Sequence, residues 1–386
     1  MLPLEGIRVV EFCEIAAGPF CGMLLADMGA DVIKVERPEG DGMRQWPPLS
    51  NGFGENFASI NRNKRSIVFD LKNEQDLAKA RRLALSADIV IENYRPGIMT
   101  RYKLDHASLA HENPKLVMVS MSAFGQDGPR GQEGGFDLTL QAISGIMSVT
   151  GEPDGAPVKC GVPLCDFVTG LYGAYAAVCA LRKVQNGENG SYIDVPMMAT
   201  SLAVAALQTS EYFGNGKDPR KLGSAHPRNA PYQAFQAADG WFAMAAGNPR
   251  LWQRVCETVE KPELENDERF ASTTLRAKNQ VELLRLLEPI FAKRSVEDWL
   301  ARFAKAGVPC APINSYSQAL ADPQVAHLGL VQEIDLPSGT RTRTVISPMR
   351  IDRKIMPVRR RPPALGEHSD EILRELGLKD NAAAAE

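Results

Sequence analysis

The stretch IRVVEFCEIAAGPFCGMLLADMGADVIKVE, residues 7–36, decides the fold class of this chain. Its first six residues form an apolar run typical of a buried strand, and Gly18-Pro19 opens the helical pattern FCGMLLADMGA. Residues 31–36, DVIKVE, predict a second strand. A strand, a helix and a strand in this order make one βαβ unit, in which the two strands run parallel.

The same pattern recurs farther along the chain. SIVFDL, DIVIEN and residues 116–122 predict strands, and EQDLAKARRLALSA predicts a helix between the first two. We therefore expect an α/β fold whose large domain is Rossmann-like, with a parallel sheet flanked by helices. Helices over 167–183 and 197–213, with the strand SYIDV between them, complete this domain.

Changes in composition divide the chain. The segment GNGKDPRKLGSAHPRNAP, residues 214–231, is rich in Gly, Pro and charge, which predicts a linker or a mobile active-site loop after a large domain over 1–213. A hairpin around Asp239-Gly240, followed by helices near 250–260, 274–293 and 296–306, predicts a smaller α+β domain over 232–329. A second hairpin and the helix SDEILRELGL, within 330–386, are expected to return to the large domain. We assign no role to the closing AAAAE.

Composition narrows the class of partner and the compartment. The net charge of −3 among 386 residues gives no basic excess for a nucleic acid or an anionic membrane, which favours a small-molecule partner. The N-terminus lacks the features of a signal peptide, and the apolar stretches are expected to be too short to span a bilayer. Seven cysteines without CxxC spacing indicate neither a disulfide framework nor a zinc site, so we expect a cytoplasmic protein.

Few motifs of known chemistry are present. The turn after the first strand reads EIAAGP instead of GxGxxG, which gives little support for a nicotinamide or flavin cofactor. Nucleophile elbows, P-loops and HExxH are missing. No metal site is expected, because metal-binding spacing is not found among His106, His111, His226, His327 and His368.

Asp166 is the carboxylate that the sequence singles out. It lies in GVPLCDFVTGLYGAYAAVCAL, at the start of a long apolar helix that should be buried. One interpretation is a plain N-cap, whose oxygen accepts a backbone N–H of the first turn. The other is a nucleophile, kept ionised in an apolar cleft by the helix dipole and the free N–H groups. The pattern alone leaves both open.

Several separated motifs cover nearly the whole chain in order. They are LEGIRVVEF, AAGPFCGMLLADMGADVIKVERPEGD, INRNKRSIVFDLK, IENYRPG, FGQDGPRGQEGGFDLTLQAISGIMSVTGEPDG, GVPLCDFVTGLYGA, PYQAF, AGVPCAPIN, DPQV and PPALGEHSDEIL. Through them the chain resembles class III CoA transferases, the family of the formyl-CoA and carnitine CoA transferases. The resemblance implies acyl-CoA and carboxylic acid substrates, no tightly bound cofactor, and an interlocked homodimer.

The resemblance also assigns residues. It implies that Asp166 is the nucleophile of a ping-pong reaction that passes through an acyl-aspartyl anhydride and an aspartyl-CoA thioester. It places Glu14, Ile15, Ala16 and Ala17 in the turn beside the adenosine end and the thioester. Contacts to the nucleotide or pantetheine are implied for Arg37, Lys72, Asn93 and Arg101.

Departures from the formyl-CoA transferase pattern bear on the substrate. Ala16 replaces a glutamine, and GSAHPRNAP replaces a run of glycines, so oxalate and formate are disfavoured. In that loop, His226 and Arg228 could bind the distal carboxylate of a dicarboxylic acid, although both could simply be exposed loop residues. The pattern LGSAHPRNAPYQAF resembles members that act on succinyl-CoA and C4 to C6 dicarboxylates.

Two alternatives remain. The α-methylacyl-CoA racemases resemble these transferases but use a histidine in an AGHD motif, whereas Phe136 stands at that position here, in GGFD. A phenyl ring cannot act as an acid or a base. A protein that binds CoA without catalysis is the other alternative, and the intact Asp166 argues against it.

Overall fold

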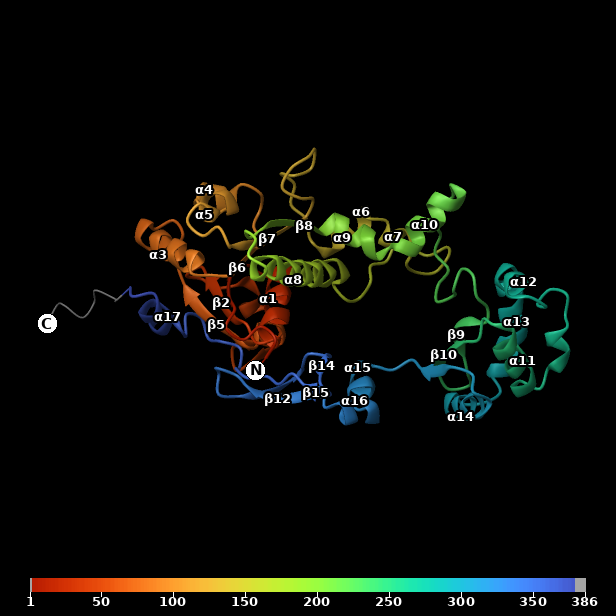
Figure 1. The fold of residues 1–386 in the computed structure, drawn as a ribbon. Coiled ribbons are helices and arrows are strands. Elements are labelled where there is room, and N and C mark those ends of the chain that lie inside the picture. Colours follow the sequence, from red (N-terminus) through yellow and green to blue (C-terminus); the bar gives the residue numbers. More distant parts are fainter. Residues whose placement is uncertain (1, 379–386) are drawn as a thin grey trace. The chain divides into compact units, whose positions relative to one another are not determined.

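The computed structural model describes residues 2–378 and divides them into two compact units (Figure 1). The first contains residues 2–146, 159–216 and 323–378, and the second contains residues 147–158 and 217–322. These boundaries differ from the predicted ones: residues 147–158 belong to the second unit, as does most of the predicted linker 214–231. The AAAAE tail lies outside the described residues.

A nonlocal pairing explains the shifted boundary. The N–H of Gly223 donates to the carbonyl of Gly151 over 2.9 Å. The ammonium of Lys221 donates to the carbonyl of Gly155. Residues 147–158 carry no periodic pattern, so their partner across the chain could not be predicted from the sequence.

Within the described residues, six parallel strands form the sheet of the first unit, in the order β5-β2-β1-β6-β7-β8. The predicted α/β fold with a parallel sheet is confirmed. The predicted strand 66–71 is shifted, because the strand begins two residues earlier at Lys64, whose charged side chain is buried in an ion pair. The strands are β1 (Arg8–Phe12), β2 (Asp31–Glu36), β5 (Lys64–Val68), β6 (Ile89–Glu92), β7 (Val117–Ser122) and β8 (Tyr192–Pro196).

Helices cover both faces of this sheet (Figure 1). Val9 faces the core beneath α1 (Ala17–Asp27) and α8 (Leu164–Gln185), whereas its neighbour Val10 faces the opposite core. That opposite core also contains residues of α3 (Glu74–Leu85), α5 (His106–Ala110) and α17 (Ser369–Glu375). The strands are therefore buried on both faces, as apolar parallel strands require.

Helix α8 begins three residues before the predicted start at Phe167. By length and composition it could cross a membrane, so the expectation that every apolar stretch is too short was wrong. Part of α8 lies against α1 and β7, with Ala174 and Ala177 in the shared core. Gly170 permits this approach, because a Cβ at that position would lie 2.6 Å from the carbonyl oxygen of Ala17.

The helix predicted over 197–213 is interrupted at Ala205. It forms α9 (Met197–Val204) and α10 (Ala206–Asn215). The other short elements of the first unit's N-terminal part are η1 (Gly42–Gln45), β3 (Leu49–Ser50), β4 (Phe53–Gly54), α2 (Glu55–Asn61), α4 (Ile98–Arg101) and α6 (Asp137–Ile143), while α7 (Ile146–Val149) crosses the boundary between the units.

The C-terminal segment belongs to the first unit. It contains the predicted hairpin, and its run MPVRRRPP is held through Asn63, whose side-chain oxygen accepts the N–H groups of Arg359 and Arg360 over 2.7 and 3.0 Å. The elements of this segment before α17 are α16 (Pro323–Leu328), β12 (Val331–Asp335), β13 (Arg341–Val345), β14 (Arg350–Ile351) and β15 (Lys354–Ile355).

The second unit has its own aromatic core. The rings of Phe242 and Phe291 meet edge to face at 5.2 Å, and Trp299 contacts Phe291 at the same distance. The helix predicted over 274–293 is interrupted at Asn279. The elements of the second unit after α7 are β9 (Tyr232–Gln236), β10 (Trp241–Ala245), α11 (Pro249–Thr258), η2 (Pro262–Glu265), α12 (Thr273–Lys278), α13 (Gln280–Phe291), α14 (Val296–Ala306), β11 (Cys310–Pro312) and α15 (Tyr316–Leu320).

Candidate active site

A cavity of about 520 Å³ in the first unit gathers the predicted nucleophile and the predicted turn. It is lined by residues after β1, β6 and β7, where ligands bind in open parallel sheets. The first turns of α1 and α8 form another part of its wall. Of the predicted residues, it is lined by Glu14, Ile15, Ala16, Ala17, Asn93 and Asp166.

Asp166 is the third residue of α8, and the residue at the N-cap position is Pro163. The N-cap interpretation of Asp166 is therefore wrong. Asp137 of α6 binds the end of α8 instead, since its carboxylate accepts the N–H of Cys165 over 2.9 Å. Gln141 donates to the other oxygen of Asp137 over 2.8 Å. With the helix end satisfied from outside, the Asp166 carboxylate lines the cavity.

The protonation of Asp166 differs from the expectation. Burial, and secondly the negative charge of Asp137, raise the pKa of Asp166 to about 7. We expected the helix dipole to keep this carboxylate ionised, which corresponds to a low pKa. Desolvation by burial is the larger of the two causes that raise the pKa, so near neutral pH the ionised and protonated forms coexist.

The turn opposite has an unusual backbone. Ile15 has φ of 69°, in the left-handed region that β-branched residues rarely adopt. The side chain of Asn93 holds the preceding residue at two points: its oxygen accepts the N–H of Glu14 over 3.0 Å, and its amide nitrogen donates to the carbonyl of Glu14 over 2.8 Å. Asn93 thus fixes the turn as well as lining the cavity.

Two predicted basic residues lie in an adjoining cavity of about 330 Å³. Arg37 and Lys72 line it, and Glu14 and Tyr94 line both cavities. The Nε of Arg37 lies 3.6 Å from the carboxylate of Glu14. The guanidinium of Arg101 stands 5.7 Å from the ring centroid of Tyr102, another lining residue, so Arg101 lies beside this cavity.

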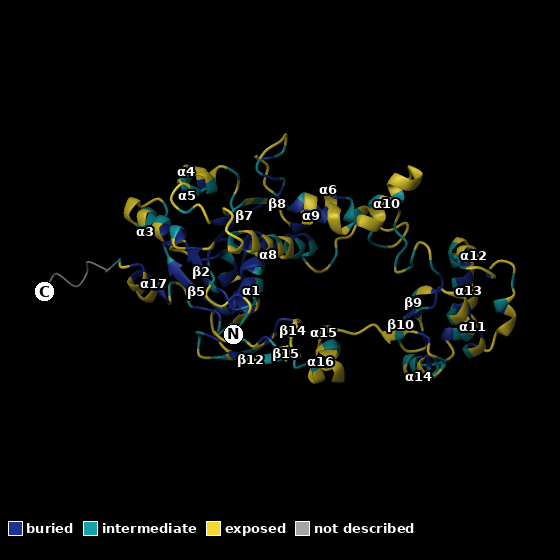
Figure 2. Cartoon of the chain, viewed as in Figure 1, coloured by how far each residue is buried: buried dark blue, intermediate teal, exposed yellow. Residues whose placement is uncertain are grey.

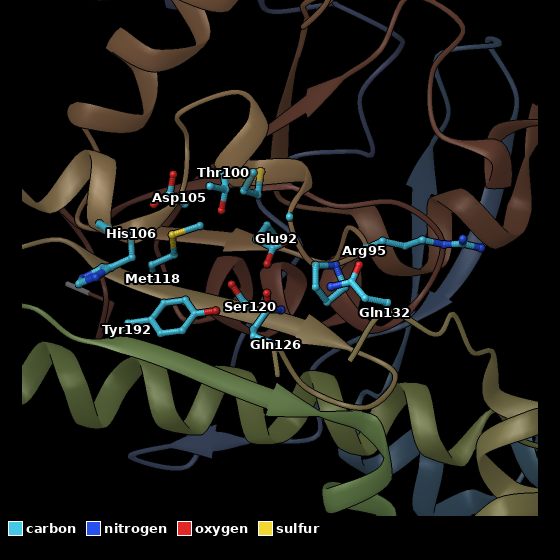
Figure 3. A pocket seen from close by; sticks show the side chains of 14 residues that line it. Glu92, Arg95, Thr100, Asp105, His106, Met118, Ser120, Gln126, Gln132 and Tyr192 are labelled. Carbon is cyan, nitrogen blue, oxygen red and sulfur yellow. The ribbon is translucent and has the colours of Figure 1, made fainter. Parts of the chain in front are cut away.

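A third cavity, of about 480 Å³, shares Arg95 and Pro96 with the lining of the Asp166 cavity. Figure 3 shows its lining side chains. Glu92 projects into it, and burial raises the pKa of Glu92 to about 7. The carboxylate of Glu92 accepts the N–H of Tyr94 over 2.9 Å. Figure 3 shows the guanidinium of Arg95 pointing away from Glu92. Glu92 therefore anchors the segment that carries Asn93 and Arg95 to the Asp166 cavity.

His226 and Arg228 lie in the second unit. The Nδ1 atom of His226 accepts the N–H groups of Arg228 and Asn229 over 3.1 Å each. The imidazole ring also lies 5.0 Å from the ring of Tyr232. Burial and the charge of Arg228 lower the pKa of His226, which agrees with a neutral ring that accepts hydrogen bonds. His226 thus organises a tight turn of this loop.

Two further observations concern the alternatives. Phe136 is 74% exposed and lines the Asp166 cavity, where its phenyl ring can supply neither an acid nor a base. Among residues 2–378, no group of three or more His, Cys, Asp or Glu side chains could hold a metal ion.

Sequence reasoning missed four buried charged residues whose side chains bind backbone atoms of the segments around this cavity: Asp137, Glu92, Lys34 and Asp41. A signal was available for two of them. Lys34 stands among the apolar residues Ile33 and Val35 of β2, and Glu92 ends the apolar strand β6; both side chains are charged and buried. Asp137 and Asp41 lie in irregular or short segments, where a carboxylate is ordinary.

Comparisons with known proteins agree with this geometry. A family model described as CoA-transferase family III matches residues 4–369. The succinate–glutarate CoA-transferase of Agrobacterium fabrum is 40% identical over 99% of this chain and 97% of its own length. The human succinyl-CoA:glutarate CoA-transferase is 36% identical, covering all of this chain and 88% of its own. A crystal structure of a CaiB/BaiF family protein from Brucella suis has a TM-score of 0.86 at 40% identity, covering 97% of this chain and 99% of that one.

Proposed function

This chain belongs to CoA-transferase family III, and we propose that it transfers coenzyme A from succinyl-CoA to a short dicarboxylic acid through a covalent intermediate on Asp166. The predicted family and enzyme class are confirmed by the family model and the relatives. Glutarate is the first acceptor to test, because the relatives from Agrobacterium fabrum and human are named for it.

One observation carries the covalent mechanism. The carboxylate of Asp166 stands at the start of α8, is not its N-cap, and lines a cavity together with the turn 14–17. A half-buried carboxylate that is not hydrogen-bonded as a cap retains its lone pairs for attack on a carbonyl carbon. Its raised pKa increases the basicity of the ionised form, and basicity favours nucleophilic attack.

The first half-reaction forms the enzyme thioester. An oxygen of Asp166 attacks the thioester carbonyl of succinyl-CoA, and the carbon–sulfur bond breaks to release the CoA thiolate. The thiolate then attacks the Asp166 carbonyl of the mixed anhydride, which releases succinate and leaves an aspartyl-CoA thioester. In the second half-reaction the acceptor carboxylate attacks the aspartyl-CoA thioester and releases the CoA thiolate. The thiolate then attacks the acceptor's carbonyl of the new anhydride, which forms the product thioester and releases the Asp166 carboxylate. Each half-reaction exchanges one thioester for another, so no ATP is required.

The same walls can stabilise the charge that develops. α1 begins at Ala17 and α8 at Leu164, and the first N–H groups of a helix have no partner within the helix. Residues of both first turns line the cavity. Negative charge on the tetrahedral carbon's oxygen would be stabilised by the positive end of α1, because the carboxylate of Asp137 already binds the first turn of α8.

We propose that three basic side chains bind the phosphates and nucleotide of CoA: Arg37, Lys72 and Arg101. The first two line the adjoining cavity, and Arg101 stands beside it. Glu14 and Tyr94 line both cavities, so one elongated ligand could pass from the basic part to Asp166. The acyl end of the donor would then reach the nucleophile.

His226 and Arg228 remain proposals for the acceptor's distal carboxylate. The support for them is chemical: a guanidinium and an imidazole edge on one tight turn suit a carboxylate. Because Nδ1 of His226 accepts backbone N–H groups, the Nε2 atom is the one that would donate to a ligand.

We also propose that the chain acts as a homodimer in the cytoplasm. α10 presents exposed residues along its length in Figure 2. A set of large apolar side chains is exposed on α8, α9 and α10, which are neighbours in this order, and apolar surface gathered in this way is typical of an interface. They are Leu171, Tyr172, Tyr175, Val178, Leu202, Val204, Leu207, Tyr212 and Phe213. The seven free cysteines suit a reducing compartment.

The direct test is capture of the intermediate. Purified protein is incubated with succinyl-CoA, with and without glutarate, and new CoA esters are followed by mass-detected chromatography. We expect glutaryl-CoA to form, and Asp166→Asn and Asp166→Ala to reduce the rate by about 10³-fold or more, as when other enzymes lose a nucleophile. With hydroxylamine present, the peptide containing Asp166 should gain the mass of a hydroxamate.

A matched control separates the nucleophile from a general effect of charge removal. Asp194 is an exposed carboxylate of β8 that accepts the N–H of Gln126 over 2.9 Å and does not line the Asp166 cavity. Asp194→Asn should retain at least a third of the activity, within the usual range of a conservative change. Turnover that survives in Asp166→Ala, or a hydroxamate on another residue, would refute the covalent mechanism.

A further inference from the structure

Four buried charged side chains lie against the turn that faces Asp166. They are Glu11 of β1, Lys34 of β2, Asp41 before η1, and Lys64 of β5, each no more than 1% exposed. Lys34 Nζ lies 2.9 Å from Asp41 and 3.2 Å from Glu11, and Lys64 Nζ lies 2.9 Å from Glu11. We call these four residues the ionic brace. Two ammonium groups and two carboxylates leave it without net charge.

The ionic brace also binds backbone atoms. Lys34 donates to the carbonyl of Cys13 over 2.7 Å, and Lys64 donates to the carbonyl of Pro19 over 2.8 Å. Both oxygens of Asp41 lie 3.2 Å from the N–H of Ile15. The brace therefore holds both ends and the middle of residues 13–19, the segment whose inner part, 14–17, lines the cavity.

Of the three contacts, the one at Ile15 supports an unfavourable backbone conformation. Ile15 is β-branched and has a φ of 69°, a conformation that persists only when the surroundings enforce it. Asp41 binds the N–H of this residue. Burial opposes ionisation of Asp41, but the charge of Lys34 and the N–H groups of Met43 and Ile15 outweigh it and lower its pKa.

An apolar cluster could fill the same space at lower desolvation cost, because buried ion pairs seldom add net stability over well-packed apolar residues. Such a cluster could not bind the carbonyl of Cys13 or the N–H of Ile15. α1 approaches closely enough that a Cβ at Gly22 would come 1.8 Å from a carboxylate oxygen of Glu11. The charges thus sit where they restrain backbone geometry.

We propose that the ionic brace is the positioning device of the transferase site, with Lys34 and Asp41 as positioning residues that hold Ile15 in the left-handed conformation and thereby set the turn 14–17 opposite Asp166. This inference rests on the proposed function, since it concerns the formation of the Asp166 thioester. The nucleotide part of the site is lined by Arg37 and Lys72, and Ile15 is not among its lining residues.

The test is Asp41→Asn, which keeps the size of the side chain but removes its charge and one of its acceptor oxygens. We expect kcat to fall about 10- to 100-fold, the scale on which small misplacements at an active site act. KM for succinyl-CoA should change less than about threefold, because the groups proposed for the nucleotide are untouched. Lys34→Gln should give the same split between kcat and KM.

Rescue distinguishes positioning from stability. Glycine adopts a φ near 69° without strain, so Ile15→Gly added to Asp41→Asn should restore kcat at least fivefold, although it removes a side chain that packs. Amide hydrogen exchange of the peptide spanning 13–20 should quicken in Asp41→Asn. A double variant no faster than Asp41→Asn alone would overturn the proposal.

The matched control is Asp27→Asn. Asp27 forms another buried ion pair in the same unit, with Arg62 at 2.6 Å. It is the last residue of α1, at the opposite end of this helix from the turn. Asp27→Asn should lower the unfolding temperature about as much as Asp41→Asn but leave kcat within twofold. Equal loss of kcat in both variants would contradict a positioning role. If the wild type forms no thioester on Asp166, the proposed function itself fails, which is a distinct result.

Discussion

At the scale of the residue, Asp166 shows how one side chain is made available for chemistry by another. A carboxylate in the first turn of a helix usually binds backbone N–H groups. Here Asp137 binds the N–H of Cys165 and occupies that role. The same arrangement places a second negative charge near Asp166, and together with burial it raises the pKa of Asp166. Asp137 therefore contributes both to the position and to the basicity of the nucleophile.

The pH dependence follows from this pair. Only ionised Asp166 can attack, and its pKa is about 7, so kcat/KM for succinyl-CoA should rise with pH and level off above pH 7. In Asp137→Asn the neighbouring negative charge is gone, which lowers the pKa of Asp166 and moves the rising limb to lower pH. Burial is the larger cause of the raised pKa and remains in this variant. The midpoint of the rising limb should therefore stay at a higher pH than the usual pKa of an aspartate.

The measurement is kcat/KM between pH 5 and pH 9 for the wild type and Asp137→Asn, with intact folding checked by circular dichroism at each pH. A limb that moves to higher pH in the variant, or does not move, would contradict the assigned interaction. Asp105→Asn is the control, because Asp105 caps α5 through the N–H of Ser108 and lies outside the Asp166 cavity.

At the scale of the element, the site depends on the close approach of α1 and α8. Both helices begin at the same cavity, and they pack through small residues. Gly170 lies one turn after Asp166 and faces the carbonyl oxygen of Ala17. The spacing between the two helix ends is thus set by a residue without a side chain, because any Cβ there meets backbone that cannot rotate away.

Gly170→Ala should separate α1 from α8 near the nucleophile. A Cβ would lie 2.6 Å from the Ala17 oxygen, so the helices must shift, and we expect kcat to fall at least tenfold by misplacement of Asp166. Overpacking should also lower the free energy of unfolding by about 1–3 kcal/mol. Chemical denaturation and steady-state kinetics measure the two effects.

Gly173 provides the matched control for this variant. It lies on the same helix, but a Cβ there would meet the side-chain sulfurs of Met121 and Cys21 at 3.2 and 3.3 Å, and side chains can move. Gly173→Ala should therefore keep at least half of the activity. Full activity in Gly170→Ala would show that the helix spacing does not control the site.

At the scale of the whole molecule, the helices after the nucleophile leave apolar surface exposed. Phe213 is 82% exposed and Leu207 is 63% exposed, both on α10. Side chains of this size are normally buried within a chain or against a partner. The proposed homodimer would cover them.

Sedimentation equilibrium tests the dimer. We expect twice the chain mass of 42.2 kDa for the wild type at micromolar concentration. Leu207→Asp combined with Phe213→Asp should shift the equilibrium to the monomer or reduce solubility, because a buried unpaired charge is costly. Val281→Asp, on an exposed apolar residue of α13, should leave the mass unchanged. A wild-type mass of one chain at all concentrations would refute the dimer.

The sequence by itself determined the fold class, most of the strand and helix positions in the first unit, the family, and the nucleophile candidate. These follow from local signals: hydrophobic period, turn residues and contiguous motifs. Two predicted elements were wrong in their bounds, again because of local signals. The strand at Lys64 was predicted to begin two residues late, because two basic residues in a row usually indicate a loop. The helical pattern over 197–213 is continuous, so it gave no sign of the interruption at Ala205.

Only the tertiary structure decided what acts on the nucleophile. Asp137 and Asp166 are 29 positions apart, and Asp41 and Ile15 are 26 apart, so their contacts appear once the sheet brings these segments together. The direction of the Asp166 pKa shift likewise depends on desolvation, which is a property of the surrounding fold. A sequence encodes local periodicity directly, but it specifies burial and long-range electrostatics only through the folded chain.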